Sequence, residues 1–191
     1  PDGVVNDRWG VPYHGFLTRE YTDIPEIIPE PWESTRGLGY SFGFNQDEDE
    51  RHSLSGAALI RLLVDVVAKN GNLLINVGPA ADGSIPELQR RAMRELGTWL
   101  QANGDAIYGT RPWIRMGERT GAPRRYTATG STVHVHALDP SVGTIELPDE
   151  LVASELRWAD GSEVERSGSD RATAIIPAAL RAEAVAVLSA G

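Results

Sequence analysis

Two short stretches near the start of the chain bring together side chains that could cleave a glycosidic bond. Residues 6–10 (NDRWG) supply a carboxyl group, a guanidinium and an indole, and residues 18–21 (TREY) add a second carboxyl group. Glu20 follows a predicted strand in a polar and aromatic neighbourhood, where partial burial would suit a carboxyl group to general acid catalysis. The alternative for Glu20 is an ordinary surface glutamate, because most glutamates are exposed.

Asp7 and Arg8 each have a catalytic and a structural interpretation. Glycosidases need two carboxyl groups, about 5 Å apart when they retain the anomeric configuration and further apart when they invert it. From the residues alone Asp7 is the second candidate, although an Asp between Asn and Arg also serves as a hydrogen-bond hub. Arg8 could donate a forked pair of hydrogen bonds to sugar hydroxyls or to a catalytic carboxylate, or it could pair with Asp7 or Glu33.

Aromatic residues crowd the first 45 positions, and flat rings stack well on the apolar faces of pyranoses. Within residues 39–44 (GYSFGF), alternation along a predicted strand places Tyr40, Phe42 and Phe44 on one face. We expect Phe42 to line a pocket at the end of that strand and the other two rings to fill the interior of a barrel.

Three other patterns offer weaker chemistry. His134 and His136 share one face of a predicted strand, but no third ligand stands at metal-binding spacing, so we expect them on an exposed face. Residues 45–56 echo a calcium loop without its glycine or its final glutamate. The turn at residues 78–83 lacks the spacing and the lysine of a phosphate-binding loop. The sequence therefore predicts no metal site and no phosphate-binding loop.

The elements that must position these side chains alternate between strand and helix from about residue 3 to residue 103. An apolar stripe predicts a helix that begins after Ser53 or Ser55, either of which could cap it, and that ends at Asn70-Gly71. Residues 72–77 (NLLINV) predict an inner strand. Residues 84–87 (SIPE) resemble a capping box before a second helix, which ends at residues 103–104. This layout is typical of an α/β fold with a parallel sheet.

The pattern changes beyond Trp113. Residues 132–137 and 184–187 alternate with period two, Asp160-Gly161 predicts a tight hairpin turn, and no helical stripe appears. Several short strands in a domain of this size most simply make a small antiparallel β-sandwich. We therefore predict a fold of class α/β plus all-β, with one domain at residues 1–112 and a second at residues 113–191.

Composition excludes several classes of partner. The 191 residues are 41% hydrophobic, which is enough for a real core, and they carry a net charge of −9. This charge repels phosphate backbones and anionic membrane surfaces, so we expect neither nucleic acid nor a membrane as a partner. The chain has no cysteine, so disulfides are excluded and the sequence gives no clue to its compartment. No apolar run approaches the ~20 residues of a membrane span.

Five ordered segments resemble the α-L-fucosidases of glycoside hydrolase family 29: residues 6–10, 32–33, 39–45, 65–79 and 105–111. The resemblance covers residues 3–113, and residues 65–79 (DVVAKNGNLLINVGP) are its most specific part. It implies a (β/α)8-like barrel followed by a β-sandwich, and an exo-acting enzyme that removes terminal α-L-fucose with retention through a covalent intermediate. On that pattern we expect the chain to be a C-terminal fragment that supplies only the last strands of the barrel.

The resemblance also implies roles for individual residues. Glu20 looks like the acid/base, Arg8 like the arginine that lines the fucose site, and Phe42 like an aromatic contact to fucose, and no metal or organic cofactor is required. The family's nucleophile is an Asp in a strand before residues 6–10, so Asp7 becomes part of the motif's scaffold. We therefore expect the chain to lack the nucleophile.

Three hypotheses for function follow. In the first, the chain is the C-terminal part of a retaining α-L-fucosidase that acts on fucosylated glycans or oligosaccharides, and its open sheet associates with a second copy or with a complementing N-terminal barrel part. In the second, the chain is a non-catalytic fragment that binds glycans or self-assembles. In the third, Asp7 and Glu20 act together as an inverting or substrate-assisted hydrolase within an oligomer.

Overall fold

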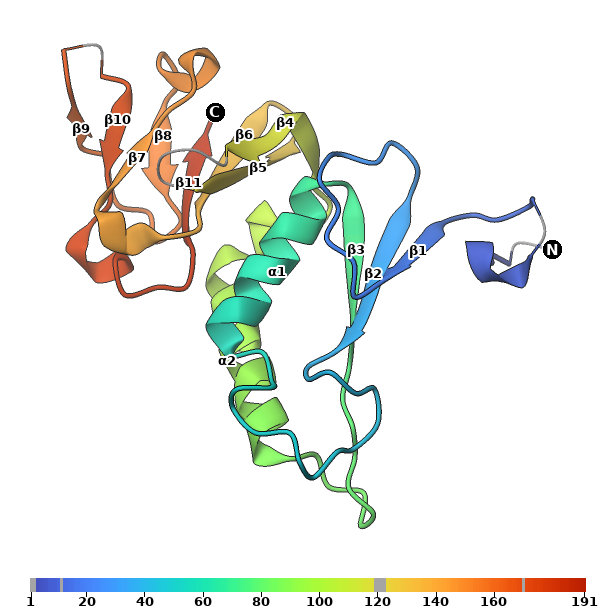
Figure 1. Ribbon diagram of the computed structural model, residues 1–191. Helices are drawn as coiled ribbons and strands as arrows, with labels where there is room; N and C mark the ends of the chain where they lie inside the picture. Colours follow the sequence, from blue (N-terminus) through green and yellow to red (C-terminus); the bar gives the residue numbers. More distant parts are fainter. Residues whose placement is uncertain (1–2, 11, 119–122, 170) are drawn as a thin grey trace. The chain divides into compact units, whose positions relative to one another are not determined.

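The computed structural model describes residues 3–10, 12–118, 123–169 and 171–191 (Figure 1). The chain forms two compact units, Pro1–Leu96 and Gly97–Gly191, which divide within helix α2 (Glu87–Asn103). The domain boundary after residue 112 stays a prediction. In the part of the chain that the structure describes, no helix is both long enough and apolar enough to cross a membrane.

The first unit contains a three-stranded parallel sheet. Its strands β1 (Leu17–Glu20), β2 (Trp32–Gly37) and β3 (Gly71–Asn76) lie in the order β1-β2-β3, and helix α1 (Gly56–Ala68) connects β2 to β3. A parallel bridge joins Asn6 to Phe16 beside β1, just before the short 3-10 helix η1 (Asp7–Trp9). The α/β arrangement predicted for this part of the chain is therefore present.

The two faces of this sheet differ in chemistry, because residues in register across parallel strands point to the same side. On one face Trp32 is almost fully buried in an apolar cluster with Val66 of α1. On the other face Thr18, Glu33 and Asn72 form one row across the three strands. A row of polar side chains thus crosses the sheet on the face away from α1.

Helix α1 begins and ends where local groups satisfy its backbone. Oγ of Ser55 accepts a hydrogen bond from N of Ala58 at 3.2 Å, so Ser55 is the cap among the two predicted residues. The predicted stop is also present, because Asn70 adopts the left-handed conformation with φ of 72° directly before β3.

The predicted capping box before α2 is wrong. The helix begins only at Glu87, and Oγ of Ser84 donates to Oδ1 of Asp82 at 2.6 Å. Ser84 therefore closes a turn with Asp82 instead of accepting a hydrogen bond from a helix amide.

The predicted strand at residues 39–44 is also wrong. These residues belong to an irregular β2–α1 loop (residues 38–55). Oε1 of Glu48 accepts from N of Ser41 at 2.8 Å, and Nδ2 of Asn76 donates to O of Phe42. Because side chains hold backbone groups that a strand would pair, Tyr40 and Phe44, the two rings expected to fill an interior, are 70% and 49% exposed instead.

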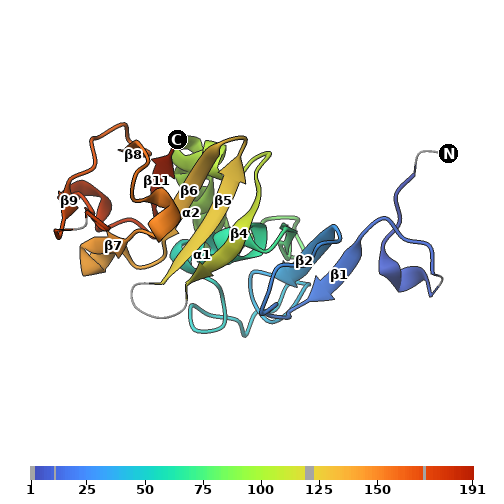
Figure 2. The same ribbon diagram turned by 90° about the horizontal axis from the view of Figure 1, so that it is seen from above.

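The second unit is built from two antiparallel sheets around one apolar core. The core includes Tyr126, Ile145, Trp158 and Leu188, which come from both sheets. Figure 2 shows β4, β5 and β6 side by side. The larger sheet has the order β4-β5-β6-β11-β8; its strands are β4 (Arg111–Glu118), β5 (Arg124–Thr129), β6 (Thr132–Ala137), β8 (Leu156–Trp158) and β11 (Ala186–Ala190). The smaller sheet has the order β7-β10-β9; its strands are β7 (Thr144–Glu146), β9 (Arg166–Ser167) and β10 (Thr173–Ile175).

Several local predictions for this unit are confirmed. The predicted strand at residues 132–137 is β6. The hairpin turn after β8 has N of Trp158 donating to O of Ser162 at 3.1 Å, and Gly161 adopts φ of 83°, a conformation that favours glycine. The described part of this unit has no α-helix after residue 103.

The expectation that His134 and His136 lie on an exposed face is wrong. Both side chains are buried, because β6 is central in its sheet and lies between β5 and β11. Nε2 of His136 lies 2.9 Å from Oγ1 of Thr127, and Nδ1 of His134 lies 2.8 Å from Oγ of Ser189. Burial lowers the pKa of His136 to about 3 and also lowers the pKa of His134. Both imidazoles are therefore neutral parts of the core at neutral pH.

Candidate active site

The predicted site residues lie at or just beyond one edge of the parallel sheet. Glu20 is the last residue of β1 and Phe42 follows β2, at the edge where Asn76 ends β3. Arg8 follows Asn6, which pairs in parallel with Phe16 beside β1. Because parallel strands all end at the same edge, short segments distant in sequence are brought together there.

Asp7 is a structural hydrogen-bond hub. Oδ1 accepts from N of Thr18 at 2.9 Å and from Oγ1 of Thr18 at 2.7 Å, and Oδ2 accepts from Nη1 of Arg19 at 3.2 Å. The hydrogen bond from the Thr18 hydroxyl is the main cause that lowers the pKa of the Asp7 carboxyl. Asp7 therefore anchors η1 to β1, and its carboxylate is committed to that role.

Arg8 forms an ion pair with Glu20 and with neither of the carboxylates predicted as its structural partners, Asp7 and Glu33. Nη1 of Arg8 lies 2.7 Å from Oε2 of Glu20, and Nε donates to Oγ1 of Thr18 at 2.8 Å. The Glu20 side chain is 39% exposed, and its carboxylate contacts Arg8. Surface ion pairs contribute only about 0–1 kcal/mol to stability. The pair therefore orients the two groups more than it stabilises the fold.

Tyr21 links Glu20 to the loop that carries Phe42. Its hydroxyl accepts from N of Gly37 at 2.9 Å and donates to O of Gly39 at 3.1 Å. Tyr21 itself has φ of 49°, which is uncommon for a residue with a side chain. No sequence pattern assigned a role to Tyr21. No spacing rule could have found its bonds to Gly37, the last residue of β2, and to Gly39 of the loop, which lie 16 and 18 residues away.

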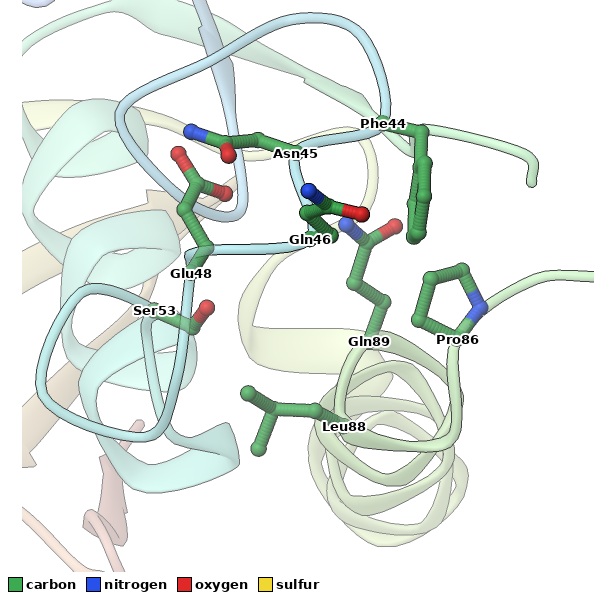
Figure 3. A pocket seen from close by; sticks show the side chains of 8 residues that line it. All are labelled: Phe44, Asn45, Gln46, Glu48, Ser53, Pro86, Leu88 and Gln89. Atoms are coloured by element: carbon green, nitrogen blue, oxygen red, sulfur yellow. The ribbon is translucent and has the colours of Figure 1, made fainter.

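A pocket of about 180 Å³ lies between the β2–α1 loop and the start of α2 (Figure 3). Both walls belong to the first unit. The loop contributes Phe44, Asn45, Gln46, Glu48 and Ser53, and the start of α2 with the residue before it contributes Pro86, Leu88 and Gln89. This lining combines an aromatic ring with amide, hydroxyl and carboxylate groups.

The described residues contain no cluster of three or more His, Asp or Glu side chains that could hold a metal ion.

Comparisons with known proteins identify relatives for the whole length of the chain. A family model described as Alpha-L-fucosidase matches residues 1–105. An α-L-fucosidase of Branchiostoma floridae is 34% identical over 151 residues, which are 75% of this chain and 34% of that protein. Human tissue α-L-fucosidase is 32% identical over 158 residues, which are 79% of this chain and 34% of that protein.

Solved structures agree in fold. The Thermotoga maritima α-fucosidase, in complex with a mechanism-based inhibitor, is 40% identical with a TM-score of 0.86, and the match covers 98% of this chain and 45% of that one. α-L-Fucosidase isoenzyme 1 from Paenibacillus thiaminolyticus is 33% identical with a TM-score of 0.80, covering 93% of this chain and 45% of that one. The chain thus spans about a third of the length of the curated relatives and under half of these solved chains.

Proposed function

Because the chain belongs to the α-L-fucosidase family, we propose that it contributes part of the active site of a retaining exo-α-L-fucosidase. Such an enzyme releases terminal α-L-fucose from glycoconjugates or oligosaccharides. The observation that carries the proposal is the pairing of Arg8 with Glu20 at 2.7 Å, at the sheet edge that also carries the Phe42 loop. The proposal requires no metal and no organic cofactor.

Glu20 is the acid/base of the proposed reaction. In the first step its carboxyl group protonates the glycosidic oxygen as the aglycone leaves, and in the second step its carboxylate deprotonates the incoming water. Its position at the end of β1 and its exposed side chain leave it accessible to a substrate. The ion pair with Arg8 fixes the direction in which the carboxylate points.

Arg8 and Phe42 are the proposed contacts to fucose. A guanidinium has five N–H donors, and the described residues engage Arg8 only through Nε and Nη1. The remaining donors are free to bind sugar hydroxyls. The Phe42 ring is 36% exposed and is oriented by the Tyr21 ring, so it offers a flat apolar surface to a pyranose.

Retention also needs a nucleophilic carboxylate, about 5 Å from the acid/base. Asp7 is a poor choice because three hydrogen bonds from Thr18 and Arg19 engage it. The proposal therefore does not use Asp7 as the nucleophile and follows the family resemblance, in which the nucleophile is an Asp of a strand before residues 6–10. The same three hydrogen bonds disfavour the third hypothesis, in which Asp7 and Glu20 share the chemistry.

The proposed architecture is the last part of a (β/α)8-like barrel at residues 1–112, followed by a β-sandwich domain at residues 113–191. The parallel strands β1-β2-β3 and the polar row of Thr18, Glu33 and Asn72 are compatible with a barrel wall and its interior face. Trp9 and Tyr13, near the outer side of β1, are 71% and 81% exposed. Exposed rings beside an edge strand favour association with a second copy or with a complementing barrel part.

The experiment that tests the function is hydrolysis of an aryl α-L-fucoside by the purified chain, alone and after reconstitution with the N-terminal part of a relative. Glu20→Gln removes the ionisable group at nearly constant volume, and Glu30→Gln is the matched control on an exposed glutamate. If the Glu20→Gln variant retains activity, and preparations without this chain show none, the assignment of Glu20 as the acid/base is contradicted. Light scattering on the same samples tests the predicted association, which a stable monomer at micromolar concentration would contradict.

The second candidate is a non-catalytic fragment that binds fucose or glycans or self-assembles. It is favoured because hydrogen bonds from Thr18 and Arg19 engage the Asp7 carboxylate. Glu20 therefore has no second carboxylate on η1 with which to share catalysis. Calorimetric titration with L-fucose separates a binder from a scaffold. Loss of the heat in Arg8→Ala, but not in the exposed control Arg51→Ala, is expected if the sugar binds at Arg8.

A further inference from the structure

We propose that the pocket between the β2–α1 loop and the start of α2 binds a neutral hexopyranose, namely the sugar to which the terminal fucose of a substrate is attached. The inference rests on the proposed function and adds a second sugar subsite to it. Four features of the pocket support it: its lining, an amide donor that the described fold does not use, the rigidity of its walls and its place beside Phe42.

The lining matches the surface of a neutral sugar. The Phe44 ring is 49% exposed and stands at the pocket beside Pro86 and the Gln89 amide (Figure 3). A sugar ring presents an apolar face that stacks on such a ring and hydroxyls that need hydrogen-bond partners. Gln46, Ser53 and the Gln89 amide supply polar groups for these hydroxyls. The Glu48 carboxylate in the same wall disfavours an anionic ligand.

Gln89 supplies a donor that has no use within the fold. Its side chain is 9% exposed, and Oε1 accepts from N of Gly78 at 2.9 Å. Since a backbone amide can only donate, this bond fixes which end of the side-chain amide is oxygen. Among the described residues no acceptor takes a hydrogen bond from Nε2. Nε2 is not among the described buried side-chain atoms that lack a partner, so it is open to solvent at the pocket, where it can donate to a ligand hydroxyl.

The walls of the pocket are held in place before any ligand arrives. Oε1 of Glu48 accepts from N of Ser41, and Nδ2 of Asn45 donates to Oγ of Ser41 at 3.2 Å. Oε2 of Glu48 packs against Gly39, so closely that a Cβ atom added to Gly39 would lie 2.0 Å from it. A wall that is already ordered reduces the entropy lost on binding.

The pocket lies next to the proposed fucose contact. Phe42 and Phe44 flank Gly43. The backbone of Gly43 packs closely on Gly78, because a Cβ atom added to Gly78 would lie 2.7 Å from the carbonyl carbon of Gly43. At most roughly 7 Å of extended chain separates the two phenylalanines. Adjacent rings on one loop can therefore contact adjacent sugars of one glycan.

The test uses nuclear magnetic resonance of the isotope-labelled full chain, titrated separately with lactose and with L-fucose. We expect lactose to shift the signals of Gly43, Phe44 and the Gln89 side-chain amide, and L-fucose to shift those of Arg8 and Glu20. Phe44→Ala should weaken lactose binding about fivefold, as loss of one aromatic contact implies, and leave the response to L-fucose unchanged. Tyr40→Ala is the matched control, because Tyr40 is an exposed ring of the same loop that does not line the pocket.

The two ligands separate the inference from the proposed function. Absence of lactose-dependent shifts in the pocket, or lactose shifts that persist unchanged in Phe44→Ala, would overturn the inference even if L-fucose binds at Arg8. Lactose shifts in the pocket without any response of Arg8 or Glu20 to L-fucose would contradict the proposed function and leave the pocket as a hexose site.

Discussion

The ring of Tyr21 meets the ring of Phe42 edge to face, with centroids 5.4 Å apart and planes at 72°. Tyr21 directly follows Glu20, and its hydroxyl bridges N of Gly37 and O of Gly39. One side chain therefore ties the proposed acid/base at the end of β1 to the loop that presents the proposed sugar contact. This relationship gives the first prediction.

Tyr21→Phe keeps the ring contact and removes only the hydroxyl. N of Gly37 and O of Gly39 then lose their partner, which costs roughly 1–3 kcal/mol when such groups are buried, and the Phe42 loop becomes less ordered. We expect a lower urea midpoint and weaker L-fucose binding in calorimetry. Tyr13→Phe, at an 81% exposed position, is the control. Equal behaviour of the two variants would show that the hydroxyl does not order the loop.

Asp7→Asn should reduce the acid sensitivity of the fold. Hydrogen bonding from the Thr18 hydroxyl lowers the pKa of Asp7 below its usual 3.8, so the unfolded chain binds its proton more readily than the folded chain does. The stability from this group is present above pH 3.8 and is lost as pH falls through the lower, folded pKa. Urea midpoints measured from pH 6 to pH 2 should fall less steeply in the variant than in the parent. Parallel curves would contradict the role of Asp7 as a charged hub.

His136 should stay neutral in the folded chain until pH approaches 3. Burial lowers its pKa from 6.5 to about 3, whereas in the unfolded chain the imidazole protonates near 6.5. The stability that comes from the neutral His136 imidazole is thus fully present above pH 6.5 and decreases as pH falls from 6.5 toward 3. The ring-proton shift of His136 in magnetic resonance should be constant from pH 8 to pH 4, and His136→Gln should flatten the dependence of the urea midpoint in that range. A midpoint near pH 6 for the ring signal would mean that the residue is solvated.

Ser55→Ala should destabilise α1 by about 1 kcal/mol, because it removes the acceptor for N of Ala58. Ser53→Ala is the matched control, since Ser53 precedes the cap and makes no such bond in the described structure. Chemical denaturation of both variants checks this difference. A larger loss of stability in Ser53→Ala than in Ser55→Ala would show that Ser53, and not Ser55, caps α1.

Local interactions made much of the first unit readable from the sequence. The apolar stripe, Ser55 and the left-handed Asn70 define α1 within one segment, and the short apolar run that follows is β3. The same holds for the turn at Gly161, where a positive φ favours glycine. These predictions succeeded because the groups that satisfy the backbone lie within a few residues of it.

The errors occur where distant side chains decide the local structure. Residues 39–44 alternate like a strand, but Glu48 and Asn76 capture their backbone groups and leave them as a loop. His134 and His136 alternate like an exposed face, but their strand lies between β5 and β11 and becomes buried. A periodic pattern does not specify which segments will pack against it.

The sequence by itself determined the family, the helices of the first unit and the residue types of the site, because these depend on composition and short-range order. Only the tertiary structure decided that Arg8 pairs with Glu20 and that Asp7 is engaged by Thr18 and Arg19. These contacts depend on which strands lie side by side and in which register, since the pairing of Asn6 with Phe16 sets η1 against β1. Register is a cooperative result of packing the whole sheet, and no single segment encodes it.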